Sequence, residues 1–259
     1  MRFYLVDAFT DRPFAGNPAG VVVLDEPADA RWMQDVAAEM KHPETAFVVT
    51  AQAAPAAQAA REPKSLRWFS PMTEVDLCGH ATVATTHVLG GRQRFATRSG
   101  ILTCEARDGW VELDFPADPP QPTDDDLHTV LPGTKITFTG RGRENLFAVL
   151  KDADAVRNAQ PDLNALRALW KGRLVITAEG HHTDFVSRFF GPGVGVDEDP
   201  VTGSAHCTLA PYWAGRIGRT ELTGEQASAR GGIVKTELKG DRVLLRGQAV
   251  TIVSGELHV

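Results

Sequence analysis

Two similar stretches, 124 residues apart, constrain the fold of this chain more than any other feature of its sequence. They read "EVDLCGHATVA" (74–84) and "EDPVTGSAHCT" (198–208), and the triplet "FSP" or "FGP" stands shortly before each. Four positions correspond at this offset: Glu74 and Glu198, Gly79 and Gly203, His80 and Ser204, Ala81 and Ala205. Each stretch continues into small and apolar residues with no strongly charged face, which predicts a buried helix. We therefore infer a duplicated architecture in which each half wraps its own sheet around one central helix.

The segment between the two copies separates the halves. "PADPPQPTDDD" (116–126) has four prolines in its first seven residues, and neither a helix nor a central strand tolerates that composition. We place the domain boundary there, with a first half at 1–116 and a second half at 117–247. Halves of this length match the common size of protein domains.

Local patterns predict a mixture of strands and helices in both halves. Helices are expected at 30–41, capped by Asp29 and ended by Pro43, and at 162–171, capped by Asp162. The alanine-rich stretch 51–64 is expected to be a long hairpin loop, and Asp108-Gly109 a tight hairpin turn. Strands are expected at 3–9, 20–24, 45–50, 65–70, 101–106, 110–115, 145–150, 173–178, 184–190, 232–238 and within 242–257. The irregular alternation indicates an α/β or α+β class with mixed sheets rather than a doubly wound parallel sheet.

Charge and cysteine content exclude several classes of protein. The net charge is −6 and no basic stripe occurs, which argues against a nucleic-acid partner. The three cysteines are widely spaced without CxxC pairs, so neither a disulfide framework nor a structural zinc site is expected. Asp7 interrupts the first apolar stretch too early for a signal peptide, and no segment reaches membrane-spanning length. We expect a cytoplasmic protein without a membrane partner.

The repeated glycine-led helices suggest anion binding. Glycine lets backbone N–H groups approach a ligand closely, and the first turn of a helix has unpaired donors with a partial positive charge. Two such helix starts facing each other across a cleft between the halves would hold a small carboxylate-bearing molecule.

Four ordered motifs, spread over nearly the whole chain, resemble the PhzF-like family, named for the phenazine biosynthesis isomerase. They are "DAFTDRPFAGNPAGVV" near the start, "ETAFV" (44–48), "LRWFSPMTEVDLCGHAT" (66–82) and "GVDEDPVTGSA" (195–205). The resemblance implies an α+β fold like that of diaminopimelate epimerase, with two pseudo-symmetric halves, each a curved mixed β-sheet wrapped around a central helix. It also implies an active site between the halves, a C-terminal strand (248–259) that returns to the first half, and a homodimer.

The resemblance assigns four candidate catalytic residues. Glu44 matches the general acid/base glutamate, His80 the histidine of a Gly-His pair, Asp199 the aspartate of Glu-Asp-Pro, and Ser204 the serine of Thr-Gly-Ser. Pro43 departs from the pattern, because the phenazine enzyme has a serine there. The implied activity is a cofactor-independent isomerisation, in which a proton moves on a small carboxylate-bearing metabolite. No metal, flavin, nicotinamide or pyridoxal signature occurs, so no cofactor is expected.

Other residues are candidates for substrate contact: Asn17, Cys78, Gly79, Thr202 and Gly203. Cys78 also supports an alternative, because diaminopimelate epimerase has a catalytic cysteine in a similar Cys-Gly pair. The chain could then be an epimerase or racemase in which Cys78 works with an opposed acid, Asp199 or Glu44. Cys78 and His80 themselves, two apart at a helix start, are expected to be badly placed as a nucleophile–base pair.

Structural interpretations remain open beside these chemical ones. Glu44 would be a solvated charge at a strand start, His80 a core histidine, Cys78 a buried packing residue, and Asp199 and Ser204 local helix caps. The chain would then be a small-molecule-binding relic without activity. His181-His182 is expected to be a surface loop rather than a metal site, because adjacent strand residues point to opposite faces.

Overall fold

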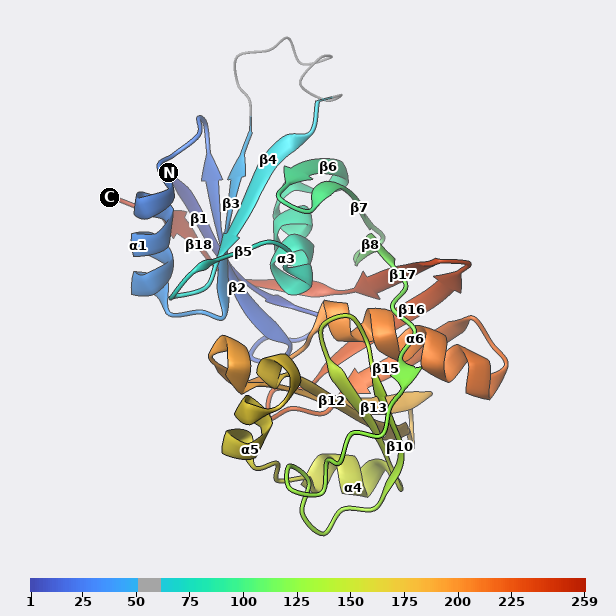
Figure 1. The fold of residues 1–259 in the computed structure, drawn as a ribbon. Helices are drawn as coiled ribbons and strands as arrows, with labels where there is room; N and C mark the ends of the chain where they lie inside the picture. Colours follow the sequence, from blue (N-terminus) through green and yellow to red (C-terminus); the bar gives the residue numbers. More distant parts are fainter. Residues whose placement is uncertain (51–61) are drawn as a thin grey trace. The chain divides into compact units, whose positions relative to one another are not determined.

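The structure is a computed structural model that describes residues 1–50 and 62–259, and the chain divides into two compact units (Figure 1). Unit 1 comprises Met1–Asp114 and Arg246–Val259, and unit 2 comprises Phe115–Leu245. The chain passes between the units within β8 (Trp110–Pro116) and within β17 (Arg242–Gly247). Most of the hairpin loop predicted at 51–64 lies outside the described residues. None of the helices in the described residues has both the length and the apolar composition needed to cross a membrane.

Unit 1 is built on a mixed sheet with the order β18–β1–β2–β3–β4. Its strands are β1 (Arg2–Ala8), β2 (Asn17–Leu24), β3 (Glu44–Val49), β4 (Lys64–Phe69) and β18 (Ala249–Glu256). β1 pairs antiparallel with β18 and β2, β2 pairs parallel with β3, and β3 pairs antiparallel with β4. β4 also pairs with β5 (Glu74–Val75) and, in parallel, with β6 (Gly91–Thr97).

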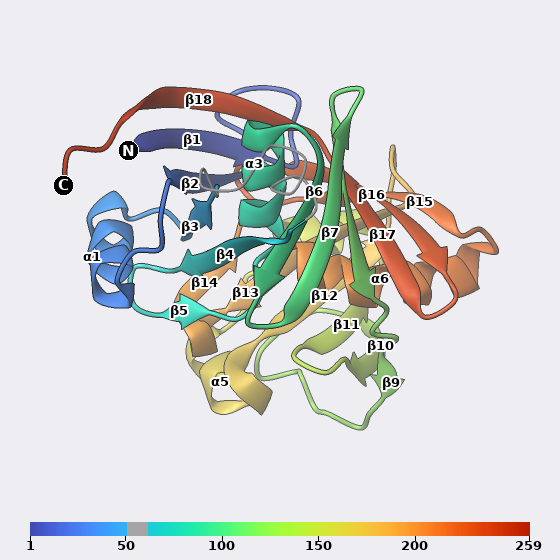
Figure 2. The ribbon, with the colours of Figure 1, turned by 90° about the horizontal axis from the view of Figure 1, so that it is seen from above.

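The central helix of unit 1 is α3 (Gly79–Leu89), which the strands surround (Figure 2). Every residue from His80 to Thr86 is buried, as the small-residue pattern predicts. β7 (Gly100–Arg107) joins β8 through Asp108 and Gly109, whose φ values of 50° and 79° are those of the predicted two-residue hairpin turn. The helix thus starts at one edge of a curved sheet that contacts it along its length.

Helix α1 (Ala30–Met40) covers the other face of this sheet. Asp29 caps it by accepting hydrogen bonds from the amides of Arg31 and Trp32, as predicted. The helix ends at Met40, one residue before the predicted end at residue 41, because Lys41 turns into the left-handed region with φ 54°. That turn leads the chain into β3, whose first residue is Glu44.

Unit 2 has a second mixed sheet with the order β10–β11–β12–β13–β15–β16. The strands are β10 (Ile136–Arg141), β11 (Leu146–Leu150), β12 (Leu174–Glu179), β13 (Phe185–Gly191), β15 (Glu221–Gln226) and β16 (Gly232–Lys239). β11–β12 and β13–β15 are parallel, and the other neighbours are antiparallel. Two short strands pair at its margins: β9 (Gln121–Pro122) with the end of β10, and β14 (Val196–Asp199) with β13.

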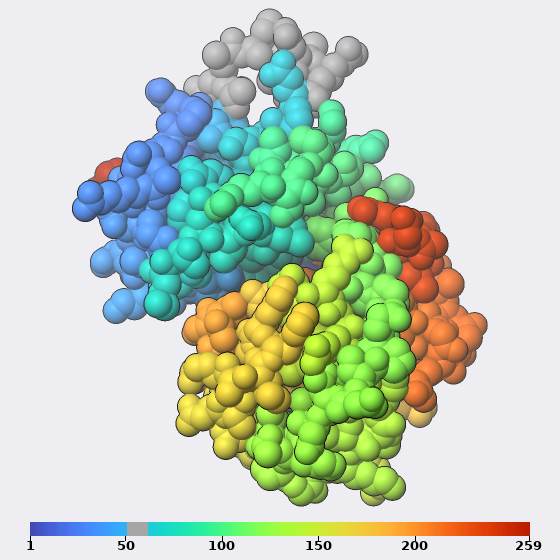
Figure 3. All heavy atoms as spheres, in the orientation of Figure 1, coloured from blue at the N-terminus to red at the C-terminus, as the bar shows by residue number. Residues whose placement is uncertain are grey.

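Helices cover both faces of the second sheet. All five residues of β11 are buried, and alternate ones point to opposite faces. Phe147 and Val149 pack with the central helix α6 (Gly203–Ile217), whereas the other three pack with α4 (Ala153–Asn158) and α5 (Leu163–Ala168). The helix predicted at 162–171 is too long. α5 ends at Ala168, Leu169 has an extended backbone, and a 3₁₀ turn with Lys171 at φ 49° follows. α5 and this turn, yellow in Figure 3, lie at the surface of unit 2.

The two units repeat contacts as well as sequence. In each unit an arginine donates two hydrogen bonds to the repeated glutamate, Arg67 to Glu74 in unit 1 and Arg188 to Glu198 in unit 2. The same arginine lies over the ring of the phenylalanine two positions after the arginine, Phe69 or Phe190. The fork of Arg67 lowers the pKa of the Glu74 carboxyl. Each pair stands just ahead of the glycine-led helix of its unit. The shared contacts support the duplication.

Candidate active site

Glu44 and His80 approach each other in unit 1. Glu44 opens β3 with a side chain that is 17% exposed, and His80 is the second residue of α3, with its ring 5% exposed. The Nε2 atom of His80 lies 3.2 Å from Oε2 of Glu44. The fold thus joins two residues that the sequence separates by 36 positions.

The imidazole of His80 is neutral at physiological pH. Burial lowers its pKa to about 3, because the charged form would lose its hydration. Although Nε2 is close to the carboxylate, their orientation is not that of a hydrogen bond, and Nε2 has no aligned partner among the described residues. A buried ring nitrogen beside an acid, without a committed hydrogen bond, suits a group that contacts substrate.

Cys78 lies beside the same ring. Its Sγ is 3.5 Å from Nδ1 of His80, so the expectation that these two residues are badly placed as a pair was wrong. Cys78 is the N-cap residue of α3, with an extended backbone of φ −142° and ψ 110°, and its thiol contacts the second helical residue. The sequence spacing alone does not give this geometry.

Glu44, Cys78 and His80 together place three ligand-type atoms within 4.8 Å of one another. The thiol lies 3.5 Å from Nδ1 and the carboxylate lies 3.2 Å from Nε2 of the same ring. A cluster of an acid, a thiol and an imidazole suits proton transfer, because each of these groups can exchange a proton.

Asn17 and Gly79 belong to the same unit. Asn17 is the fully buried first residue of β2, and β2 runs parallel to β3 with Ala19 in register with Glu44. Gly79 is the first residue of α3, directly between Cys78 and His80. A direct contact of Asn17 or Gly79 with substrate stays a prediction.

The second motif forms its own cluster in unit 2. Asp199 ends β14, Thr202 is the N-cap residue of α6, and Gly203 and Ser204 are the first two helical residues. The hydroxyl of Thr202 donates a hydrogen bond to Oδ2 of Asp199. The reading of Asp199 and Ser204 as helix caps was therefore wrong, since Thr202 occupies the cap position.

The two central helices differ from α1, α4 and α5 at their N-termini. An aspartate side chain caps α1, α4 and α5: Asp29, Asp152 and Asp162, respectively. The cap residues Cys78 of α3 and Thr202 of α6 make no side-chain capping hydrogen bond in the described part of the chain. The side chains of these two cap residues therefore accept no hydrogen bond from the first-turn amides of α3 and α6. The partial positive charge of those amides favours an anion.

Gln226 and His206 also belong to the cluster in unit 2, and the sequence analysis missed both. Gln226 ends β15 and is 1% exposed, and His206 is fully buried in α6. Both bind atoms of the segment 199–202. The sequence carries a signal only for His206, which lies one helical turn after Thr202.

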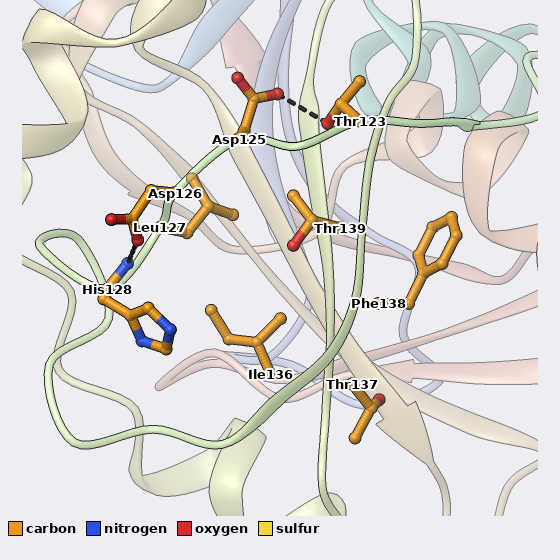
Figure 4. A pocket seen from close by; sticks show the side chains of 9 residues that line it. All are labelled: Thr123, Asp125, Asp126, Leu127, His128, Ile136, Thr137, Phe138 and Thr139. Atoms are coloured by element: carbon orange, nitrogen blue, oxygen red, sulfur yellow. Dashed lines mark hydrogen bonds between the residues drawn. The ribbon is translucent and has the colours of Figure 1, made fainter.

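A separate pocket of about 410 Å³ lies in unit 2 (Figure 4). It is lined by Thr123, Asp125, Asp126, Leu127, His128 and the β10 residues Ile136, Thr137, Phe138 and Thr139. Asp125 is bound by Thr123 and Arg141, and Asp126 accepts from the amide of His128, so both acids serve local structure. None of the predicted site residues lines this pocket, and we place the chemistry at Glu44 and His80 instead.

A mixed-sheet α+β fold with a buried helix in each unit, and an acid–imidazole pair at the start of one of them, defines a protein of the epimerase and isomerase fold class. A hydroxyproline epimerase from Agrobacterium vitis has this fold: its structure matches with a TM-score of 0.62 over 98% of this chain and 91% of its own, at 10% identity. That likeness concerns the fold alone.

The chain belongs to the PhzC/PhzF family, described as phenazine biosynthesis-like proteins, whose family model matches residues 6–255. A protein of Pseudomonas aeruginosa described as an uncharacterized isomerase is 44% identical over 271 residues, covering 100% of this chain and 99% of the relative. The crystal structure of a PhzF family protein from Enterococcus faecalis matches with a TM-score of 0.92 at 39% identity, covering 100% of this chain and 99% of that one. The family and the fold predicted from the sequence motifs are confirmed.

Proposed function

We propose that this protein is a cofactor-independent isomerase that moves a proton on a small carboxylate-bearing metabolite. The observation that carries the proposal is the 3.2 Å approach of the Glu44 carboxylate to the buried, neutral His80. The name of the P. aeruginosa relative supports the reaction class. A cytoplasmic location and a homodimer stay predictions from the sequence.

Glu44 is the proposed general base and acid. Its carboxylate takes a proton from a carbon next to an unsaturated or carboxyl group, and returns that proton to another carbon of the same molecule. The positive end of α3, at Gly79 and His80, stabilises the negative charge that develops on the substrate. His80 donates or relays a proton through Nε2 without becoming a stable cation, because its pKa is low.

We propose that unit 2 contributes to the same reaction through Asp199, Gly203 and Ser204. The N-terminus of α6 is uncapped, like that of α3, and the hydroxyl of Ser204 is exposed at its first turn. These groups would bind the substrate carboxylate, and Thr202 would hold the Asp199 side chain in place.

Proton exchange in D₂O tests the proposal. The protein is incubated with small cyclic and amino-acid-like carboxylic acids, and carbon-bound deuterium is followed by NMR. We expect exchange with at least one acid and a loss of about 10²-fold or more in Glu44→Gln, the range that a general base contributes. Absence of exchange with every acid would contradict the proposal and favour a binding protein without activity, whereas undiminished exchange in Glu44→Gln would show that Glu44 is not the base.

The 3.5 Å contact between Cys78 Sγ and His80 Nδ1 favours one second candidate, an epimerase or racemase. There the thiol would work with an opposed acid on a single carbon, and the configuration of that carbon would invert. Cys78→Ala separates the candidates: it abolishes inversion in an epimerase, but only modestly affects a proton shift that Glu44 carries out. Chiral chromatography of the products measures the difference.

A further inference from the structure

Every polar atom of Thr202 is engaged in hydrogen bonds. Its amide donates to Oε1 of Gln226 over 2.9 Å, and its carbonyl oxygen lies 2.9 Å from Nδ1 of His206. Its hydroxyl donates to Asp199 and accepts from Nε2 of Gln226 over 3.2 Å. The N-cap residue of α6 is therefore fixed by three side chains.

Gln226 is the centre of this network. Its Oε1 faces an amide, which can only donate, and its Nε2 faces the carbonyl oxygen of Asp199 at 2.8 Å, which can only accept. The orientation of the carboxamide is thus set by its partners. Gln226 is almost completely buried and lies on β15, outside all the sequence motifs.

The network holds the Thr202 hydroxyl away from its usual partner. A threonine at an N-cap normally accepts a hydrogen bond from the amide two or three positions later, here Ser204 or Ala205, and such a cap stabilises a helix by about 1 kcal/mol. Thr202 has the extended backbone of an N-cap, with φ −110° and ψ 101°, yet makes no such bond in the part of the chain described. The competing contacts with Asp199 and Gln226 account for this.

We infer that Gln226 is a positioning residue that keeps the N-terminus of α6 uncapped. By occupying Thr202, it leaves the amides of Ser204 and Ala205 available for the carboxylate of a substrate. This inference rests on the proposed function for the identity of the ligand, and on the hydrogen bonds of unit 2 for the role of Gln226.

The experiment compares Gln226→Leu with the full-length wild type by ¹⁵N NMR, using benzoate as the carboxylate probe. Without ligand, we expect hydrogen exchange at the Ser204 and Ala205 amides to slow about fivefold in the variant, because the released hydroxyl caps them. The Kd for benzoate, read from the shifts of the same amides, should rise about tenfold. Gln226→Met, closer in volume, serves if the leucine variant lacks a dispersed spectrum.

The control removes the hydroxyl. In Gln226→Leu/Thr202→Val no cap can form, and we expect exchange at both amides without ligand to return to within about twofold of the wild type. A variant at Gln226 that changes neither amide exchange nor benzoate affinity overturns the inference, and so does a double variant whose amides exchange as slowly as those of the single one. If benzoate does not shift Ser204 or Ala205 in the wild type, the carboxylate site of the proposed function is wrong, whereas exchange without ligand still decides whether Gln226 prevents capping.

Discussion

His80 shows how burial decides the chemistry of one side chain. An exposed histidine would change charge near pH 6.5, but this ring stays neutral because its charged form would be desolvated. Both of its nitrogens lie near groups that exchange protons, Nε2 near Glu44 and Nδ1 near Cys78. The ring can therefore act as a hydrogen-bond donor or relay without trapping a proton.

This neutrality predicts the pH profile of the reaction. With the pKa of His80 at about 3, the rate of carbon–deuterium exchange should show no inflection from this histidine between pH 5 and pH 8. His80→Gln should lower the rate about 10²-fold while leaving the shape of the profile over this range unchanged. Initial exchange rates measured across the range check this, and an inflection near pH 6.5 that disappears in His80→Gln would contradict it.

His206 makes folding depend on pH. Burial lowers its pKa to about 4, although the carbonyl of Thr202 opposes the shift. The pKa of an unfolded histidine is 6.5, so between pH 6.5 and pH 4 the unfolded chain binds more protons than the folded one. The stability that neutral His206 contributes is therefore present above pH 6.5 and is lost as the pH falls toward 4. When the pH is lowered from 7 to 5, the free energy of unfolding of His206→Gln should fall by about 2 kcal/mol less than that of the wild type. Urea unfolding of both proteins at the two pH values measures the difference, and equal losses would show that His206 does not titrate in this way.

At the scale of elements, the two repeated Arg–Glu forks connect different parts of the fold. Arg67 donates to Glu74 at a site where its side chain is 29% exposed. Arg188 is 11% exposed and donates to Glu198 and also to the carbonyl oxygens of Val156, Arg157 and Ala159, at the end of α4. The second arginine therefore joins a strand pair to a helix terminus, whereas the first only joins two strands.

We expect the two forks to differ in their contribution to stability. Arg188→Met should cost about 3 kcal/mol, because it leaves a carboxylate and the carbonyls at the end of α4 without their donor. Arg67→Met, its matched control, should cost about 1 kcal/mol, since Arg67 is more exposed and Arg98 still pairs with Glu74. Urea unfolding checks the order, and equal costs would show that the contacts with α4 add nothing.

For the whole molecule, the proposed function requires both units. Asp199→Asn and Ser204→Ala should each lower the exchange rate at least tenfold, although neither residue belongs to the unit that contains Glu44. Full activity in both variants would confine the chemistry to unit 1.

The sequence predicts this molecule best where one pattern decides the outcome. The two central helices, the hairpin turn at Asp108 and the Asp29 cap follow from local rules, and motif resemblance brings Glu44 and His80 into one family site. The positions of Gln226 and of the Cys78 thiol depend on tertiary packing, which no local pattern encodes. β6 was missed because "GRQRFAT" is polar and only Gln93 and Phe95 are buried, and the helix at 162–171 was overextended because Lys171 adopts a left-handed backbone.

The pairing of β18 with β1 has a consequence for synthesis on the ribosome. β1 acquires one of its two neighbours only when Ala249–Glu256 has been made, some 240 residues after Ala8. At ordinary translation rates of about 5–20 residues per second, the edge of β1 that pairs with β18 stays unpaired for roughly 10 s or longer. The nascent chain can therefore complete the inserted second unit before it closes the sheet with which it began.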